Sequence, residues 1–214
     1  VVIPEKNRRT LCVSSQAGCA LQCTFCATGA QGFDQDLKSC EIVGQLWLAN
    51  FHAKDSKPIT NIVFMGMGEP LLNFDAVIES AKIMKDQLAY GLSRKRVTIS
   101  TSGIVPNIDR LSKEIDISLA ISLHASENKL RDQIVPINKK YPIESLLRSC
   151  KKYLENYQNK RSITIEYILI DEINDSLDHA NKLSKLLSNI SCKINLIPFN
   201  SFKGSSYKRP SMKK

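Results

Sequence analysis

The 214-residue sequence lacks any apolar run long enough to span a bilayer, and it lacks a signal segment near its first residue. A secreted or membrane-embedded protein is therefore not expected. The chain also lacks the pattern of a disulfide framework, because its seven cysteines are an odd number outside a secretory context. We expect a cytoplasmic protein with reduced thiols, no membrane contact and a monomeric state.

Acidic residues are in the minority, with 30 Lys and Arg against 21 Asp and Glu and a formal net charge of +9. Such a surplus favours a polyanionic partner, RNA or DNA before a membrane, although a basic protein without such a partner is the plainer alternative. Hydrophobic residues make up 43% of the chain, which indicates a globular core rather than disorder. We see no internal repeat or linker, so we expect one domain over residues 1–214.

Strand-like and helix-like segments alternate along the chain. The apolar, β-branched runs predict strands over 10–14, 61–67, 96–101, 116–123, 162–170 and 192–199. Helical periodicity predicts helices over 41–51, 77–88, 108–112, 143–157 and 176–188. This alternation is typical of an α/β fold with a parallel sheet and crossover helices. Six units are too few to close an eight-stranded barrel, so an open barrel and a doubly wound sheet both fit.

Small, polar or ligand-type residues follow five of the six predicted strands, where function gathers in parallel α/β folds. They are the cysteine cluster after the first strand, then residues 65–70, 100–103, 122–124 and 198–200. Taken alone, each residue also has a purely structural interpretation. Gly66 and Gly68 would permit a tight turn, and His124 would be a core histidine whose hydrogen bonds are satisfied. We expect the five strand ends to surround one mouth.

Cys19, Cys23 and Cys26 form a C-x3-C-x2-C cluster in a loop bordered by glycines. A zinc site would need a fourth ligand, and no histidine lies nearby in the sequence. An iron–sulfur cubane accepts one cysteine per iron, so three cysteines leave one iron open to another ligand. The other cysteines fall at apolar positions of predicted strands or helices and are interpreted as small core residues: Cys12, Cys40, Cys150 and Cys192.

The motifs together resemble those of the radical S-adenosylmethionine (SAM) enzymes, and within them the RNA adenine-C2 methyltransferases, along almost the whole chain. The matching stretches are TLCVSSQAGCALQCTFCATGAQGF, ITNIVFMGMGEPLLN, RVTISTSGIVP, LAISLHA and INLIPFN. The resemblance implies an open parallel (βα)6 partial TIM barrel. It also implies two substrates, an adenosine of the peptidyl-transferase region of 23S rRNA and the adenosine beside the tRNA anticodon, and an electron donor such as flavodoxin.

The resemblance further assigns site residues. Cys19, Cys23 and Cys26 would hold a [4Fe–4S] cluster whose fourth iron binds SAM, and Phe25 would pack against the adenine side. Residues matching the family's SAM contacts are Gly68, Glu69, Ser100, Ser122, Leu123, His124 and Asn200. In the family, the radical formed from SAM takes hydrogen from a cysteine-bound methyl group, and the methylene adds to C2 of adenine. Cys12 matches a second cysteine that resolves the protein–RNA adduct through a disulfide.

Three family features have no match here: the methyl-carrying cysteine, the proton-accepting glutamate and the amino-terminal RNA-recognition domain. We therefore expect a core fragment that ligates a cluster and binds SAM but does not complete methylation alone. A group of basic residues near the last residue would track phosphate or form a solvated tail: Lys203, Lys208, Arg209, Lys213 and Lys214.

Three rival interpretations remain open. The C8-methylating sibling shares these motifs, and the position of the methyl group in the product separates the two. A radical SAM methylthiotransferase would need further cluster cysteines, which the sequence does not show. The non-enzymatic rival is a metal-stabilised RNA-binding module, which would be colourless and loaded with zinc.

Overall fold

The structure, a computed structural model, describes residues 1–52, 57–157 and 161–211. Its main sheet has seven strands in the order β1-β2-β5-β6-β7-β8-β9, and a separate two-stranded sheet pairs β3 with β4. The strands are β1 (Val2–Glu5), β2 (Arg8–Cys12), β3 (Gln16–Gly18), β4 (Phe33–Asp36), β5 (Asn61–Phe64), β6 (Val97–Thr101), β7 (Ser118–Ser122), β8 (Ile163–Leu169) and β9 (Cys192–Pro198).

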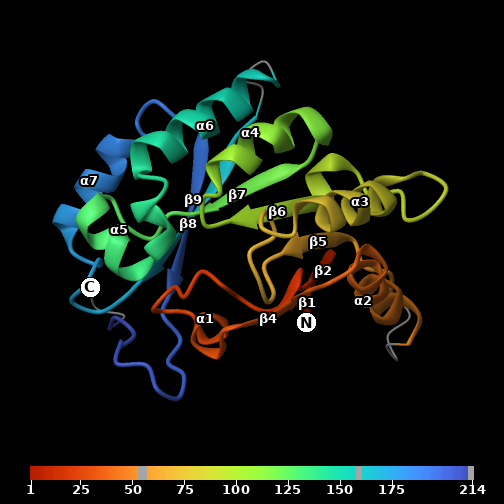
Figure 1. Cartoon of the computed structure of the whole chain (residues 1–214), viewed down its shortest axis with the longest axis horizontal. Helices are drawn as coiled ribbons and strands as arrows, with labels where there is room; N and C mark the ends of the chain where they lie inside the picture. Colours follow the sequence, from red (N-terminus) through yellow and green to blue (C-terminus); the bar gives the residue numbers. More distant parts are fainter. Residues whose placement is uncertain (53–56, 158–160, 212–214) are drawn as a thin grey trace.

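From β2 to β9 the main-sheet strands are parallel and follow chain order, and only the edge strand β1 runs antiparallel. A doubly wound sheet would contain a reversal of strand order, which this sheet does not have. Right-handed crossovers in one direction put every connecting helix on the same face. Figure 1 shows the crossover helices in an arc over one side of a curled sheet, with α1 (Ala27–Gln31) apart from them near β4. The expected open parallel (βα)6 partial barrel is confirmed, with β1 added to its edge.

The helices connect successive strands. They are α1 (Ala27–Gln31), α2 (Ser39–Phe51), α3 (Phe74–Lys85), α4 (Val105–Glu114), α5 (Asn128–Ile134), α6 (Ile143–Glu155) and α7 (Leu177–Leu187), with two 3-10 turns, η1 (Arg94–Arg96) and η2 (Pro136–Lys139). The predicted stripe of α6 is buried as expected, and the Tyr153 hydroxyl at its end donates to the Ile117 carbonyl at 2.7 Å. Among the described residues, no helix combines the length and apolarity needed to cross a membrane.

The two faces of the parallel strands differ in chemistry. Ile99, Ile121 and Ile165 point to the helix side and are fully buried in the main hydrophobic core. Their neighbours Ser100 and Glu166 occupy the opposite, concave face, because side chains alternate along a strand. The six predicted strands are confirmed within a few residues, but the strands alternate rather than being apolar on both sides.

Several sequence expectations need correction. The hairpin of β3 and β4 and the short helices α1 and α5 were not predicted, since elements of three to seven residues carry little periodic signal. Cys40 is exposed in the first turn of α2, so its interpretation as a core residue was wrong. Cys150 is buried as expected, while Cys192 is half-buried. On α2 only Ile42 and Leu46 are buried, and Trp47 is 47% exposed.

Arg131 of α5 ties the ends of two central strands together. Its guanidinium is fully buried and donates to the carbonyl oxygens of Leu123 at 2.9 Å, Ser102 at 2.7 Å and Ser122 at 3.0 Å. A third nitrogen donates to Asn138 Oδ1 at 2.9 Å. Burial lowers the pKa of Arg131 to about 10, so the group stays charged at neutral pH. The planar guanidinium group of Arg131 therefore fixes the spacing of β6 and β7 where they reach the mouth of the barrel.

Replacing Arg131 should destabilise the fold. We expect Arg131→Met to lower the free energy of unfolding by about 3 kcal/mol, because it leaves buried carbonyl oxygens without donors. Arg131→Lys should recover less than half of the loss, since one ammonium cannot reach the carbonyls of both strands. Urea unfolding followed by circular dichroism measures both values. Arg148→Met, an exposed arginine of α6, is the control and should change little; equal effects at the two positions would contradict the role of Arg131.

Candidate cofactor site

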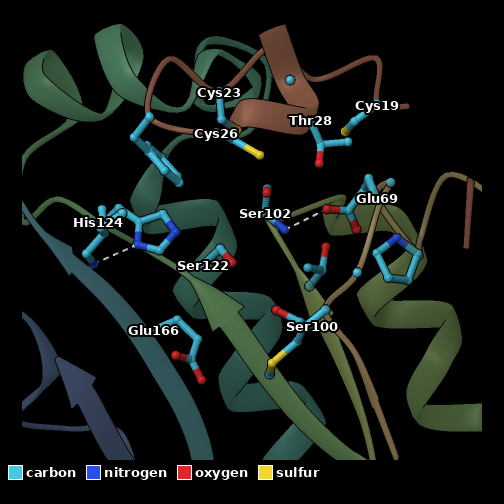
Figure 2. A pocket seen from close by; sticks show the side chains of 18 of the residues that line it. Cys19, Cys23, Cys26, Thr28, Glu69, Ser100, Ser102, Ser122, His124 and Glu166 are labelled. Carbon is cyan, nitrogen blue, oxygen red and sulfur yellow. Dashed lines mark hydrogen bonds between the residues drawn. The ribbon is translucent and has the colours of Figure 1, made fainter. Parts of the chain in front are cut away.

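A cavity of about 270 Å³ opens at the carboxyl ends of the parallel strands. Cys19, Cys23 and Cys26 lie on one side of it, and Ser100, Ser122 and Glu166 lie on the other (Figure 2). Residues from the ends of β5, β6, β7, β8 and β9 contribute to its wall. The sequence prediction that residues at several strand ends meet at one mouth is confirmed, and β8 joins them through Glu166 and Ile168.

The cysteine loop runs from β3 into α1 and is held by backbone contacts. The Cys19 N–H donates to the Gly32 carbonyl at 2.8 Å, and the Cys26 N–H donates to the Cys23 carbonyl at 3.0 Å. Gly18 begins the loop with φ +76°, and a Cβ there would lie 2.0 Å from the Gly32 carbonyl oxygen. Glycine is needed at this position because both the left-handed backbone and the close approach exclude a side chain.

Two of the three thiols, Cys19 and Cys23, lie in surroundings that disfavour negative charge. Burial raises the pKa of Cys19, and it raises the pKa of Cys23 to about 12, with the nearby Cys26, Cys19 and Glu69 adding to the rise. Three thiolates beside a buried carboxylate need a compensating positive charge, which a metal centre supplies. The loop therefore fits a metal group better than three free thiols.

The arrangement of the thiols also bears on which metal group fits. Among the described residues, no three Cys, His, Asp or Glu side chains converge on a point that would hold a single ion. A closed zinc site requires such convergence. A cubane cluster does not, because each cysteine binds a different iron atom. The donor set of Cys19, Cys23 and Cys26 therefore matches a [4Fe–4S] cluster in which one iron is left to another ligand.

Glu69 is a buried carboxylate on a glycine-rich turn after β5. Its two carboxylate oxygens accept the N–H of Ser102 at 2.8 Å and of Leu71 at 3.1 Å, while its own N–H donates to Gln16 Oε1 at 2.8 Å. Burial is the main influence on its ionisation and raises the pKa of Glu69. Gly68 precedes it with φ +97°, and a Cβ there would lie 2.5 Å from Cβ of Gln16. The turn thus presents a fixed carboxylate beside the cysteine loop, suited to an ammonium group (Figure 2).

His124 forms another part of the wall in an uncommon backbone conformation, with φ +61°. Its Nδ1 accepts the N–H of Ile168 at 3.0 Å, and its ring meets the Phe25 ring edge to face at 4.6 Å between centroids. The amide of Asn174 donates to the His124 carbonyl at 2.9 Å. Burial, followed by the charge of Arg131, lowers the pKa of His124 to about 3. The imidazole is therefore neutral and acts as a hydrogen-bonded wall.

The predicted site residues separate into two groups. The cavity is lined by the three cluster cysteines together with Gly68, Glu69, Ser100, Ser122 and His124. Leu123 is fully buried in the hydrophobic core, so only its backbone faces this end of the barrel. Asn200 is exposed beyond β9, where its Oδ1 accepts from Arg209 at 3.5 Å, and it does not line the cavity.

Cys12 also lies outside the cavity lining. It pairs in parallel register with Val63, which pairs with Thr98, so Cys12 lies on the same concave face of the sheet as Ser100, outside the residues that line the cavity. Burial raises the pKa of the Cys12 thiol. All seven cysteines are free thiols, so the structure contains no disulfide at Cys12.

The sequence analysis missed several residues of the site. Glu166 is a carboxylate in an apolar strand; burial raises its pKa, and Asn195 Nδ2 donates to it at 2.7 Å. Ser102, which lies in the predicted stretch 100–103, has a contact that the sequence did not reveal: its N–H donates to Glu69. Tyr207 hydrogen-bonds Thr24 of the cysteine loop at 2.8 Å, so the segment after β9 contacts the loop. In that segment Lys203, Lys208 and Arg209 are exposed, and Lys213 and Lys214 lie outside the described residues.

Comparison with known proteins gives consistent matches. The family model of the radical SAM superfamily matches residues 13–183. The chain is 57% identical to the dual-specificity RNA methyltransferase RlmN of Pseudomonas putida, over 99% of this chain and 57% of that protein. The corresponding protein of Pseudomonas fluorescens is 56% identical over 99% of this chain and 56% of its own length. The chain thus spans a little over half the length of these curated relatives.

Two solved structures place the fold. A radical SAM methyltransferase from Sphaerobacter thermophilus superposes with a TM-score of 0.95 at 41% identity, covering 99% of this chain and 62% of that one. SuiB of Streptococcus suis, solved with bound S-adenosylmethionine, gives a TM-score of 0.67 at 15% identity over 96% of this chain and 45% of its own. The second likeness shows the fold alone.

The buried imidazole predicts a pH dependence of stability. In the unfolded chain, His124 becomes protonated below its ordinary pKa of 6.5. In the folded chain it stays neutral until the pH falls to about 3. The free energy of unfolding should therefore fall as the pH is lowered from 6.5, by up to about 1.4 kcal/mol per pH unit from this group.

Asn at this position should remove that dependence. It tolerates the left-handed backbone, and its Oδ1 can accept the Ile168 N–H in place of Nδ1. We expect the His124→Asn variant to have a flatter stability profile between pH 6.5 and 4 in urea unfolding. His179→Asn, at a half-buried position in the first turn of α7, should keep the wild-type slope; identical slopes for all three proteins would contradict a buried neutral imidazole.

Proposed function

Since the chain belongs to the radical SAM superfamily, whose members use a [4Fe–4S] cluster and S-adenosylmethionine, we propose that residues 1–214 form the radical SAM core domain of an RNA adenine-C2 methyltransferase. The observation that carries the proposal is that three cysteine thiols face Glu69 and the polar strand ends across one cavity. The identity with dual-specificity RNA methyltransferases supplies the substrate class.

The residues of the cavity have distinct roles in this proposal. Cys19, Cys23 and Cys26 hold the cluster, which when bound supplies a low-potential electron for SAM cleavage. Glu69 takes the ammonium group of SAM, because it is a buried carboxylate already fixed by two backbone N–H groups. Ser100 and Ser122 offer hydroxyls from the opposite wall, and Phe25, stacked edge to face on His124, offers an apolar surface for a nucleobase.

Further contacts belong to the same proposal. Glu166, held by Asn195, is an acceptor for ribose hydroxyls at the deep end of the cavity. Leu123 contributes through its backbone. Asn200 and Cys12 require a movement of their segments to reach SAM or an RNA adduct, because neither lines the cavity.

The proposed macromolecular partners are 23S rRNA and tRNA, and the reductant is a small electron-transfer protein such as flavodoxin. The net charge of +9 favours the RNA partners electrostatically. A target adenine in a helical RNA has to leave its stack to reach a concave site at the strand ends. We further propose a monomer in the cytoplasm, where the seven free thiols stay reduced.

Anaerobic reconstitution with iron and sulfide tests the core of the proposal. We expect a brown protein that releases 5′-deoxyadenosine and methionine from SAM when reduced. Cys23→Ala should lose both the colour and the cleavage, whereas Cys40→Ala, at an exposed cysteine of α2, should keep both. A colourless protein that binds zinc and leaves SAM intact would contradict the proposal and indicate a metal-stabilised RNA-binding module.

To test the RNA reaction, 23S rRNA or tRNA fragments are added to the same mixture, and the RNA is then digested with nuclease and analysed for methyladenosine. Methyladenosine is compared with C2 and C8 standards, and a C8 product would contradict the C2 assignment.

Glu69 should control SAM affinity rather than cluster assembly. We expect Glu69→Gln to weaken SAM binding about tenfold or more, because it removes the charge that pairs with the ammonium group. Equilibrium binding of SAM to the reconstituted protein measures the change, and the visible spectrum should keep its intensity. Glu79→Gln, at an exposed site on α3, is the matched control. Unchanged SAM affinity in Glu69→Gln would remove Glu69 from the proposed site.

A further inference from the structure

A second cavity, of about 520 Å³, lies at the opposite end of the barrel. Its wall includes Thr98, Ser118 and Thr164, which stand two to four residues before the cofactor-site residues Ser100, Ser122 and Glu166 on the same strands. The two cavities share no lining residue. The second cavity therefore opens at the amino-terminal ends of the strands, away from the chemistry proposed above, and its function does not depend on that proposal.

Five basic side chains line this amino-terminal cavity: Arg8, Arg94, Lys95, Arg161 and Lys193. Two carboxylates compensate part of this charge. Glu5 pairs with Arg8 at 2.6 Å, and Asp116 pairs with both Arg161 and Arg94, the latter at 3.5 Å. Five positive charges against two negative ones leave a surplus of three.

Lys95 and Lys193 carry most of the uncompensated charge. Within residues 1–52, 57–157 and 161–211, neither ammonium has a carboxylate within 4.0 Å. The two lysines come from η1 and from β9 and border the same hollow. Like charges brought together in this way raise the local potential and favour an anion between them.

The remaining wall is prepared for oxyanion binding. Arg161 is held by Asp116 at 2.7 Å and lies over the Tyr157 ring at 3.6 Å, so its guanidinium is fixed in place before a ligand arrives. The hydroxyls of Thr98, Ser162 and Thr164 line the same space and can donate to phosphate oxygens, while the Ser118 hydroxyl donates to the Arg94 carbonyl at 3.4 Å. A fixed guanidinium, mobile ammonium groups and hydroxyl donors are the set that recognises phosphate.

We propose that the amino-terminal cavity binds a small molecule that carries two or more phosphate groups. The ligand is small because the basic groups line a hollow bounded by strand ends, whereas the backbone of RNA is bound along open, extended surfaces. It carries more than one phosphate because the positive surplus comes from two separate elements, η1, which directly precedes β6, and β9, which lies three positions from β6 in the sheet. Pyrophosphate is the simplest probe of this chemistry.

Calorimetric titration of the full chain with pyrophosphate tests the proposal, with sulfate at equal ionic strength as the reference anion. We expect saturable binding, and a double variant Lys95→Gln and Lys193→Gln should weaken it about a hundredfold, roughly tenfold for each charge-assisted hydrogen bond lost. The matched control replaces Lys113 and Lys151, exposed on α4 and α6, which removes the same charge elsewhere. Both double variants should keep the unfolding temperature of the unliganded protein.

Three results would overturn the inference. They are the absence of saturable pyrophosphate binding, equal weakening in the control variant, and binding of sulfate as tight as that of pyrophosphate. A short single-stranded RNA forms the last arm of the experiment. If the RNA binds through Lys95 and Lys193 while pyrophosphate neither binds nor competes, the small ligand is excluded and the cavity belongs to an RNA contact.

Discussion

Parallel pairing in strict chain order, from β2 to β9, is the constraint on which the rest of the structure depends. Because the order never reverses, each right-handed crossover returns on the same side, and all the covering helices lie on one face. The other face is left without helices, and the natural twist curls it into a concave surface. Polar side chains such as Ser100 and Glu166 can occupy that surface because it borders cavities instead of core, while Ile99 and Ile165 on the alternate positions hold the sheet to its helices.

The same concave surface carries opposite electrostatic character at its two ends. At the carboxyl ends of the strands, burial keeps His124 neutral and raises the pKa values of Cys19, Cys23 and Glu69, so this end accepts positively charged groups. At the amino-terminal ends, Lys95 and Lys193 leave a positive surplus. Strands of four to seven residues, roughly 13 to 23 Å long, separate the two environments, and this exceeds the Debye length of about 8 Å, so solvent-exposed ions near one end are largely screened from the other.

The sequence predicted the parallel sheet and most strand-end residues because both depend on patterns of residue type along a single segment. Arg131 was missed for the opposite reason: its partners are carbonyl oxygens, which every residue has, so nothing in the sequence marks the contact. Glu166 was missed because one glutamate in an apolar strand does not reveal which face it occupies. Cys40 was assigned to the core from periodicity, but the first turn of a helix can turn its side chain to solvent. Cys12 and Asn200 match family motifs, yet their place relative to the cavity follows from strand register and loop path.

The cysteine loop is a further case in which distant segments decide local geometry. Its backbone is fixed by the Gly32 carbonyl beyond α1 and by the Ile134 carbonyl of α5, which accepts the Thr24 N–H at 3.1 Å. Tyr207, far along the chain, bonds the Thr24 hydroxyl and packs near Cys23 and Phe25 on a small apolar cluster with Ala125 and Val135. These contacts bury the thiols and so raise the cost of ionising them without a metal. The packing that orders the loop is therefore also what makes it depend on a cationic centre, because a looser, wetter loop would ionise its thiols without one.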